Sequence, residues 1–197
     1  MRTLVISGHP DLQKSRVSAE FLKQLSRTQA TIHRLSEHNR NYQFDIPREQ
    51  AILTSHDRIV LLFPMFWYSM PALMKKWLDD VFLPGFAYAR GGDKLAGKEI
   101  LVVTTVGAPA AGYRAGGFNN YTVDELLRPI QQTARYVKAE FLPTIAIYES
   151  VFLDDLAIRD AVAEAVPRIV GKQESPDQIY ENLLLKAEMA QIDLIAG

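Results

Sequence analysis

Short apolar segments alternate with helical patterns along most of this chain. Apolar segments of strand length lie at residues 3–8, 57–64 and 98–106, and weaker ones at 30–35 and 139–148. Segments with an apolar residue every three or four positions predict helices at residues 15–29, 47–55, 71–82, 155–171 and 177–195. The pattern therefore predicts an α/β protein in which strands and helices follow one another in turn.

Local signals place the ends of two helices. Thr122 and Glu125 have the spacing of a capping box, so a helix should start there, and Pro129 should break or kink it. Ser175 supplies a cap for the last predicted helix, and Asp177 supplies an acid at its positive end.

Strands that alternate with helices indicate a parallel sheet covered on both faces. Five parallel strands with five or six helices fit the doubly wound, flavodoxin-like order 2-1-3-4-5, in a single domain over residues 1–197. Ligands bind such sheets at the carboxyl ends of the strands. We therefore expect the site in three loops, at residues 8–18, 64–71 and 104–118.

Composition narrows the class of protein. The formal net charge is -1, so no basic excess favours nucleic acid or an anionic membrane surface. The chain has no cysteine, which excludes disulfides and zinc–thiolate sites, and no metal site is expected. Residues 1–8 are too short an apolar segment for a signal peptide, so we expect a cytoplasmic protein.

The loop after the first strand has the features of a phosphate site. It ends at a helix N-terminus, where free backbone N–H groups and the helix dipole favour an anion. It lacks the Walker and G-x-G-x-x-G patterns. The alternative is that Ser15 is only a helix cap and His9 an ordinary loop residue. The candidate phosphate contacts are His9, Ser15, Arg16, Val17 and Ser18.

The loop after the third strand carries three consecutive aromatic residues. At least one of them should face a pocket, because three neighbours in a turn cannot all point into the core. A flat heteroaromatic ligand would stack against such a wall. The alternative is packing between helices or at a subunit interface. The candidates are Pro64, Met65, Phe66, Trp67 and Tyr68.

The segment FPMFWYSMPALMKKWLDDVFLPGFAY, residues 63–88, resembles the NAD(P)H:quinone oxidoreductase family. Residues 44–50 and 85–98 are similar to the bacterial ancillary subunits of glutathione-gated potassium efflux systems within that family. The resemblance extends from residue 3 to about residue 150.

The resemblance implies a bound flavin that accepts a hydride from NAD(P)H. His9 and residues 15–18 would hold the flavin phosphate, and residues 64–68 would line the isoalloxazine ring. Phe86 and Tyr88 would lie near a dimer interface. The short 85–98 segment favours FMN over FAD, which stays the alternative.

The third loop both matches and departs from the family pattern. Family members read T-T-G-G where this chain has its candidate cofactor contacts Thr104, Thr105, Val106 and Gly107. Glycine there lets the backbone approach the flavin, so Val106 changes the expected contacts. The alternative for the threonines is ordinary strand content.

Tyr113 matches a tyrosine that, in the mammalian quinone reductases, lies beside the flavin. Those enzymes place a histidine six residues further on, where this chain has Asn119. A neutral amide cannot take a proton as imidazole does. Tyr113 is therefore the candidate catalytic residue, without a proton relay, or else a plain surface tyrosine.

Three functions follow. The first is a flavin-dependent NAD(P)H dehydrogenase that reduces quinones or similar small electrophiles. The second is an ancillary subunit of a membrane potassium efflux transporter, peripheral on the membrane through that partner. The third, an electron-transfer flavodoxin, is disfavoured because such proteins are strongly acidic. A homodimer is also expected, from the surplus of large apolar residues at Trp77, Phe82, Phe86 and Tyr88.

Overall fold

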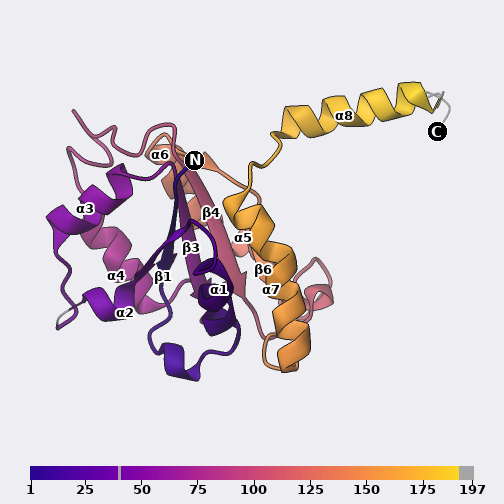
Figure 1. Ribbon diagram of the computed structural model, residues 1–197, viewed down its shortest axis with the longest axis horizontal. Helices are drawn as coiled ribbons and strands as arrows, with labels where there is room; N and C mark the ends of the chain where they lie inside the picture. The colour runs from indigo at the N-terminus through magenta and orange to yellow at the C-terminus, as the bar shows by residue number, and fades with distance from the viewer. Residues whose placement is uncertain (40, 191–197) are drawn as a thin grey trace.

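A single parallel sheet forms the centre of the molecule. The computed structural model describes residues 1–39 and 41–190, and in this part of the chain the strands follow the order β2-β1-β3-β4-β5, with β6 also paired to β4 (Figure 1). All of these pairings are parallel, which confirms the predicted order 2-1-3-4-5. The strands are β1 (Thr3–Ser7), β2 (Thr31–Arg34), β3 (Arg58–Pro64), β4 (Glu99–Thr105), β5 (Glu140–Phe141) and β6 (Ile145–Ile147).

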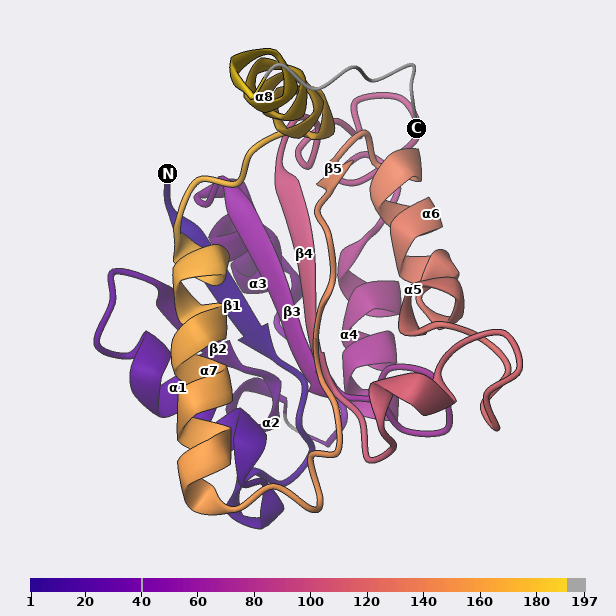
Figure 2. The ribbon, with the colours of Figure 1, turned by 90° about the vertical axis from the view of Figure 1, so that its right-hand side faces the viewer.

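Helices cover both faces of this sheet, as Figure 2 shows. One face is covered by α1 (Val17–Leu25) and α7 (Asp155–Val170). The other is covered by α2 (Leu35–His38), α3 (Ile46–Thr54), α4 (Ala72–Val81), α5 (Val123–Leu126) and α6 (Arg128–Tyr136). The last helix, α8 (Pro176–Met189), extends away from the sheet (Figure 1).

The apolar strands fill two separate cores, one on each face of the sheet. Leu4 and Ile6 of β1 pack into the core under α4, whereas Val5 between them packs into the core under α1 and α7. Side chains alternate across a strand, and both faces are covered, so both sets are apolar. This explains why the strands appear in the sequence as continuous apolar segments.

The predicted helix ends are confirmed. Thr122 caps α5 in a capping box with Glu125, and α5 gives way to α6 next to Pro129. Ser175 caps α8 in the same manner. The prediction for this last helix extends to residue 195, and residues 191–195 lie outside the described part of the chain.

The fifth strand is confirmed with one addition. The apolar stretch 144–148 within the predicted segment 139–148 contains β6, and the chain also forms a short strand β5 before it. Pro143 lies between them and has no N–H to donate to β4. Both pieces pair with β4, so together they occupy the fifth position.

Two of the residues chosen for the dimer interface are corrected by the structure. Trp77 is fully buried inside the chain, and Phe86 is buried in the same core. Phe82 and Tyr88 are only partly buried and pack against that core. Trp77 and Phe86 are therefore core residues of the single chain, whereas an interface role for Phe82 and Tyr88, and the homodimer itself, stay predictions.

Candidate functional site

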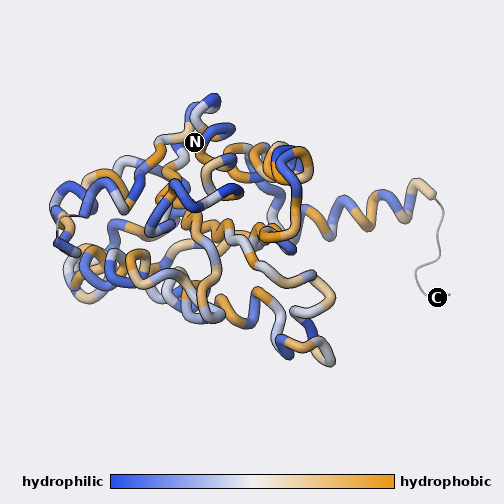
Figure 3. The backbone as a smooth tube through the Cα atoms, turned by 90° about the horizontal axis from the view of Figure 1, so that it is seen from below, coloured by the Kyte–Doolittle hydropathy of each residue, from blue (hydrophilic) through white to orange (hydrophobic). Residues whose placement is uncertain are grey.

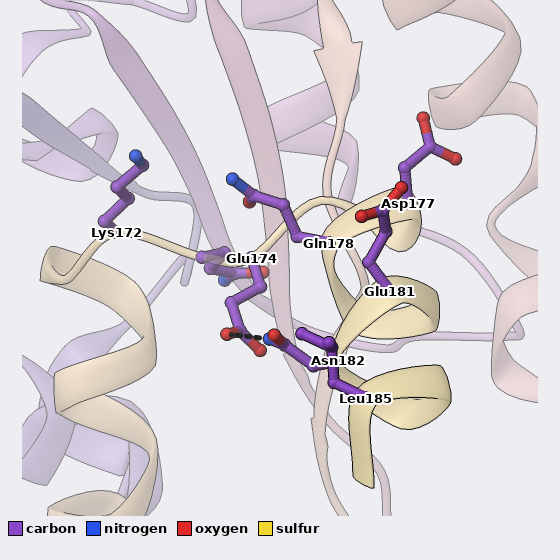
Figure 4. Close-up of a pocket in the computed structure, with 8 residues that line it drawn as sticks. Lys172, Glu174, Asp177, Gln178, Glu181, Asn182 and Leu185 are labelled. Atoms are coloured by element: carbon purple, nitrogen blue, oxygen red, sulfur yellow. Dashed lines mark hydrogen bonds between the residues drawn. The ribbon is translucent and has the colours of Figure 1, made fainter. Parts of the chain in front are cut away.

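A cavity of about 370 Å³ lies at the carboxyl ends of β1, β3, β4 and β6. Its size is within the range of small-molecule sites, roughly 300–1,000 Å³. A larger hollow of about 530 Å³ lies beside α8, far along the chain from these strand ends (Figure 4). The cavity at the strand ends is lined by His9, Lys14, Ser15, Arg16, Val17, Pro64, Met65, Phe66, Thr105, Gly107, Ser150 and Val151.

The start of α1 supplies the anion-binding part of this cavity. Ser15 Oγ accepts a hydrogen bond from the backbone N–H of Ser18, at 3.0 Å, and so caps the helix. The N–H groups of Arg16 and Val17 have no acceptor among the described residues. Unpaired N–H groups at a helix N-terminus bind phosphate well.

The cations of this loop are paired with carboxylates. Lys14 Nζ lies 3.1 Å from Asp11, and Arg16 donates to Asp155 of α7 at 2.7 Å. The ion pair between Arg16 and Asp155 places α7 at one end of the cavity. Most of the favourable field for an anion therefore comes from the helix N-terminus, with these cations partly neutralised.

His9 is held as a neutral donor. Burial lowers its pKa, and the charge of Asp11 opposes this effect. Its Nδ1 accepts the backbone N–H of Asp11 at 3.1 Å, which leaves the proton on Nε2. The ring lies edge-on to Phe66, with centroids 6.4 Å apart. His9 thus joins the phosphate end of the cavity to its aromatic wall.

Ser18 has a different environment from Ser15. It is 1% exposed, and its Oγ has no hydrogen-bond partner in the part of the chain that the structure describes. It does not line the cavity. The two serines of the predicted phosphate loop are thus separated, and only Ser15 faces the cavity.

The aromatic loop forms a two-residue turn. Phe66 and Ser69 exchange backbone hydrogen bonds at 2.9 and 3.1 Å, and the residues between them, Trp67 and Tyr68, have φ of 48° and 64°. Left-handed backbone is costly for bulky residues and gathers at functional sites. Pro64, Met65 and Phe66 line the cavity, whereas Trp67 is 93% exposed outside it.

The loop after β4 divides into buried and accessible parts. Thr104 and Val106 are buried, and the backbone of Val106 is fully used, since it donates to Ile147 at 2.9 Å and accepts from Ser150 at 3.0 Å. Thr105 and Gly107 line the cavity. Val106 therefore fixes the loop after β6 against β4, and its N–H is not available to a ligand.

Tyr113 lies in a group of tyrosines beside the cavity. Burial raises its pKa, and the neighbouring Tyr68 and Tyr148 raise it further. The rings of Tyr113 and Tyr148 are 6.0 Å apart. Asn119 Oδ1 accepts a hydrogen bond from the Tyr68 hydroxyl at 3.2 Å. Asn119 therefore supports the aromatic turn, while Tyr113 itself does not line the cavity.

Ser150 and Val151 line the cavity but are absent from the sequence-based candidates. They follow β6, which pairs with β4 at its carboxyl end. The rule that ligands bind beyond the carboxyl ends of the strands would have included this fourth loop.

The described residues contain no cluster of three His, Cys, Asp or Glu side chains able to hold a metal ion. None of the described helices is long and apolar enough to cross a membrane.

The parallel strand order and the cavity define a doubly wound α/β protein with a small-molecule site at the carboxyl ends of its strands. A family model described as a flavodoxin-like fold matches residues 1–169. The uncharacterized NAD(P)H oxidoreductase YrkL of Bacillus subtilis is 42% identical over 84% of this chain and 96% of its own. The chain belongs to the flavodoxin-like NAD(P)H oxidoreductase family.

Further similarities lie within the same family. The potassium-efflux ancillary protein KefG of Cronobacter sakazakii is 40% identical over 75% of this chain and 80% of its own. The solved NADPH-quinone reductase from P. pentosaceus has a TM-score of 0.80 at 30% identity, covering 88% of this chain and all of its own. The general stress protein 14 of Treponema denticola, in complex with FMN, has a TM-score of 0.79 at 31% identity. The match covers 86% of this chain and 98% of its own.

Proposed function

We propose that this protein is an FMN-dependent oxidoreductase that takes a hydride from NAD(P)H and reduces quinones or similar small electrophiles. The observation that carries the proposal is a single cavity that combines the unpaired N–H groups at the start of α1 with the aromatic wall of Phe66. A flavin has a phosphate and a flat ring system, and therefore needs both features. The FMN complex of a structural relative supports the same ligand.

Several of the lining residues would bind the cofactor directly. The backbone of Arg16 and Val17, with the Ser15 hydroxyl, would hold the phosphate. Pro64 and Phe66 would bound the ring system and exclude water from it.

The remaining polar groups serve as donors. His9 Nε2–H would bond to the cofactor between the phosphate and the ring, and the Gly107 N–H, which has no acceptor among the described residues, would serve the ring edge. Bound FMN supplies the chemistry of hydride acceptance and donation.

FMN is preferred to FAD because of the phosphate end of the cavity. The ion pair between Arg16 and Asp155 separates the cavity from a second hollow of about 440 Å³ between α1 and α7. The adenosine half of FAD would extend beyond the phosphate end of the cavity, whereas FMN ends at its phosphate.

The test of the activity is turnover by the purified protein. In the presence of FMN, the protein should reduce one molecule of a soluble benzoquinone for each molecule of NADH or NADPH that it oxidises. A protein that binds FMN but oxidises neither nucleotide would contradict the proposed reaction.

An ancillary role on a potassium efflux transporter is the second candidate, supported by the similarity to KefG. The nearly fully exposed Trp67 at the rim of the cavity offers an apolar contact for a protein partner. Co-purification of a tagged transporter with the wild-type protein, but not with Trp67→Ser, would support this role. Equal recovery of both would remove Trp67 from it.

A further inference from the structure

A stack of two histidines lies between the short helix α2 and the strand β2. The ring of His38, at the end of α2, is parallel to the ring of His33 in β2, with an interplanar angle of 4° and centroids 4.2 Å apart. His33 is buried, whereas His38 is partly exposed. Both lie at the end of the molecule that carries α3 and α4, and α8 projects from the other end (Figure 1 and Figure 3). The stack thus connects α2 to the edge strand of the sheet.

The inner histidine contacts a buried carboxylate. Glu49 Oε2 lies 2.7 Å from His33 Nε2 and accepts a second hydrogen bond from Trp77 at 2.8 Å. Burial raises the pKa of Glu49, but the hydrogen bonds from His33 and Trp77 outweigh burial and lower it. The carboxylate is therefore charged near neutral pH. Its charge favours a positive charge on His33, the ring in direct contact with it.

The outer histidine cannot carry a second positive charge without cost. Two parallel imidazolium rings in contact repel each other, so the stack accommodates one cation and one neutral ring. Burial lowers the pKa of His38, and the charges of His33 and Arg48 lower it further. The charges of Glu49 and Glu37 oppose this effect without reversing it. His38 is therefore the ring that stays neutral while the stack persists.

The other elements packed against α2 add no unpaired charge. The lysines of α4 are paired with the aspartates of the same helix, and β1 carries no charged residue. The charged groups that act on His38 thus come from β2, from α3 and from α2 itself.

The stack holds the middle of a segment whose two ends are anchored in the core. Leu35 is fully buried before this segment, and Phe44 is buried after it. Between these anchors, Asn41 and Tyr42 have φ of 49° and 63°, a left-handed conformation that is uncommon for residues other than glycine. The contact of His38 with β2 lies between the two anchors, so it opposes movement of this segment.

The same segment forms one wall of a hollow of about 460 Å³. Ser36, Asn39 and Tyr42 line this hollow together with Phe66. Phe66 also lines the cavity proposed for FMN. The segment therefore belongs to a hollow that borders the proposed site.

We propose that the His33–His38 stack is a pH-sensitive latch, which holds residues 36–39 and 41–43 against the body near neutral pH and releases them when His38 is protonated. Once released into water, His38 has its ordinary pKa of about 6.5. Above this value His38 is neutral in both forms, and the latch stays closed. Below it the released form takes up a proton that the closed form takes up only at lower pH, so release grows as the pH falls between the two values.

Hydrogen exchange followed by mass spectrometry tests the latch on the full chain without added flavin, so the result does not depend on the proposed function. In a peptide over residues 35–43, exchange corrected for its intrinsic pH dependence should rise by up to about tenfold for each pH unit below roughly 6.5, because one proton is taken up. A peptide over residues 110–121 is the internal control, since this segment contains no histidine and no carboxylate side chain. Its corrected exchange should not change.

Substitution of His38 separates the charge from the ring contact. His38→Phe keeps a ring against His33 but cannot be protonated, so the segment should stay protected between about pH 5 and 8. His38→Ala loses the ring, and the segment should exchange faster than in the wild type at every pH in this range.

Two results would overturn the proposal. One is a wild-type segment whose corrected exchange follows the control peptide at every pH. This comparison needs no variant, so it decides the question even where a substitution unfolds the chain. The other is a His38→Phe segment that keeps the wild-type pH dependence, which would assign the proton to another group such as His33.

Discussion

Ser15 and Ser18 lie three residues apart, but one faces the cavity and the other has a buried hydroxyl. Ser15 lines the cavity and caps α1, whereas Ser18 is buried without a partner. A hydrogen bond to a charged group contributes about 1.5–3 kcal/mol. The sequence shows two equivalent hydroxyls, and only the packing of α1 distinguishes them.

Ser15→Ala should therefore weaken FMN binding about tenfold or more, and lower the free energy of unfolding by about 1 kcal/mol through the lost cap. Ser18→Ala should change neither, because its hydroxyl has no partner to lose. Fluorescence titration with FMN measures the affinity. Ser15→Thr keeps a hydroxyl cap and should keep most of the affinity. Equal loss in the Ser15→Ala and Ser18→Ala proteins would remove Ser15 from the phosphate site.

Tyr113 should not act as a proton shuttle. Burial first, and then Tyr68 and Tyr148, raise its pKa above the ordinary value of about 10. Its hydroxyl therefore keeps its proton throughout the neutral range. Tyr113→Phe should slow flavin reduction by no more than about ten- to a hundredfold.

The ratio of wild-type to Tyr113→Phe rates should stay constant between roughly pH 6 and 9, since the phenol does not ionise there. Anaerobic stopped-flow reduction gives both rates. A ratio that changes with pH in this range would mean that Tyr113 exchanges a proton during the reaction.

Among the helices and strands, the buried carboxylate of Glu49 connects α3 with β2 and α4. Glu49 of α3 is 1% exposed and accepts bonds from His33 of β2 at 2.7 Å and from Trp77 of α4 at 2.8 Å. Burial by itself raises the pKa of Glu49, but the bonds from His33 and Trp77 lower it overall. The ionised form is thus the native one.

Glu49→Ala should lower the free energy of unfolding by about 3–5 kcal/mol, because buried donors lose their acceptor. Urea unfolding near neutral pH measures this, with the exposed Glu164→Ala as a control that should stay within about 0.5 kcal/mol. A lowered carboxyl pKa stabilises the fold above the unfolded value, and the stabilisation is lost as pH falls through the folded value. The difference between wild type and Glu49→Gln should therefore shrink in acid. A constant difference would contradict the pKa direction.

The element pattern was predictable where local chemistry decides it. The apolar strands β1, β3 and β4 and the capping box at Thr122 follow from neighbours in sequence. Pro143 marks the division of the fifth strand in the sequence itself. The full burial of Trp77 comes from packing in the core, where its indole N–H donates to Glu49, 28 residues away. Contacts distant in sequence decide this burial, so periodicity does not reveal it.

The candidate site was predictable to the same extent. The sequence analysis names three of the four loops around the cavity, and the rule on strand ends covers the fourth as well. The exposure of Trp67 and the locked backbone of Val106 depend on turn geometry and on the loop after β6. A list of residues from the motif alone therefore mixes ligand contacts with residues that hold the loops in place.

In the whole molecule, the proposed site is a cavity of about 370 Å³ at the strand ends, and Phe66 bounds its aromatic side. A cavity of this size, once it holds FMN, would leave one exposed ring face for a nicotinamide or an acceptor in turn. The nucleotide should leave before the acceptor binds.

Steady-state rates should accordingly give parallel lines in double-reciprocal plots as the acceptor concentration varies. Lines that intersect would mean that both substrates occupy the protein together, and the single-face account would be wrong.

The central claim, that the cavity holds FMN, is tested most directly by the cofactor itself. The full-length protein, purified or reconstituted with FMN and FAD separately, is examined by absorption spectroscopy, and the cofactor released on denaturation is identified by mass. We expect a flavin spectrum with one FMN per chain, and weaker binding of FAD. Binding of neither flavin at micromolar concentration would contradict the account.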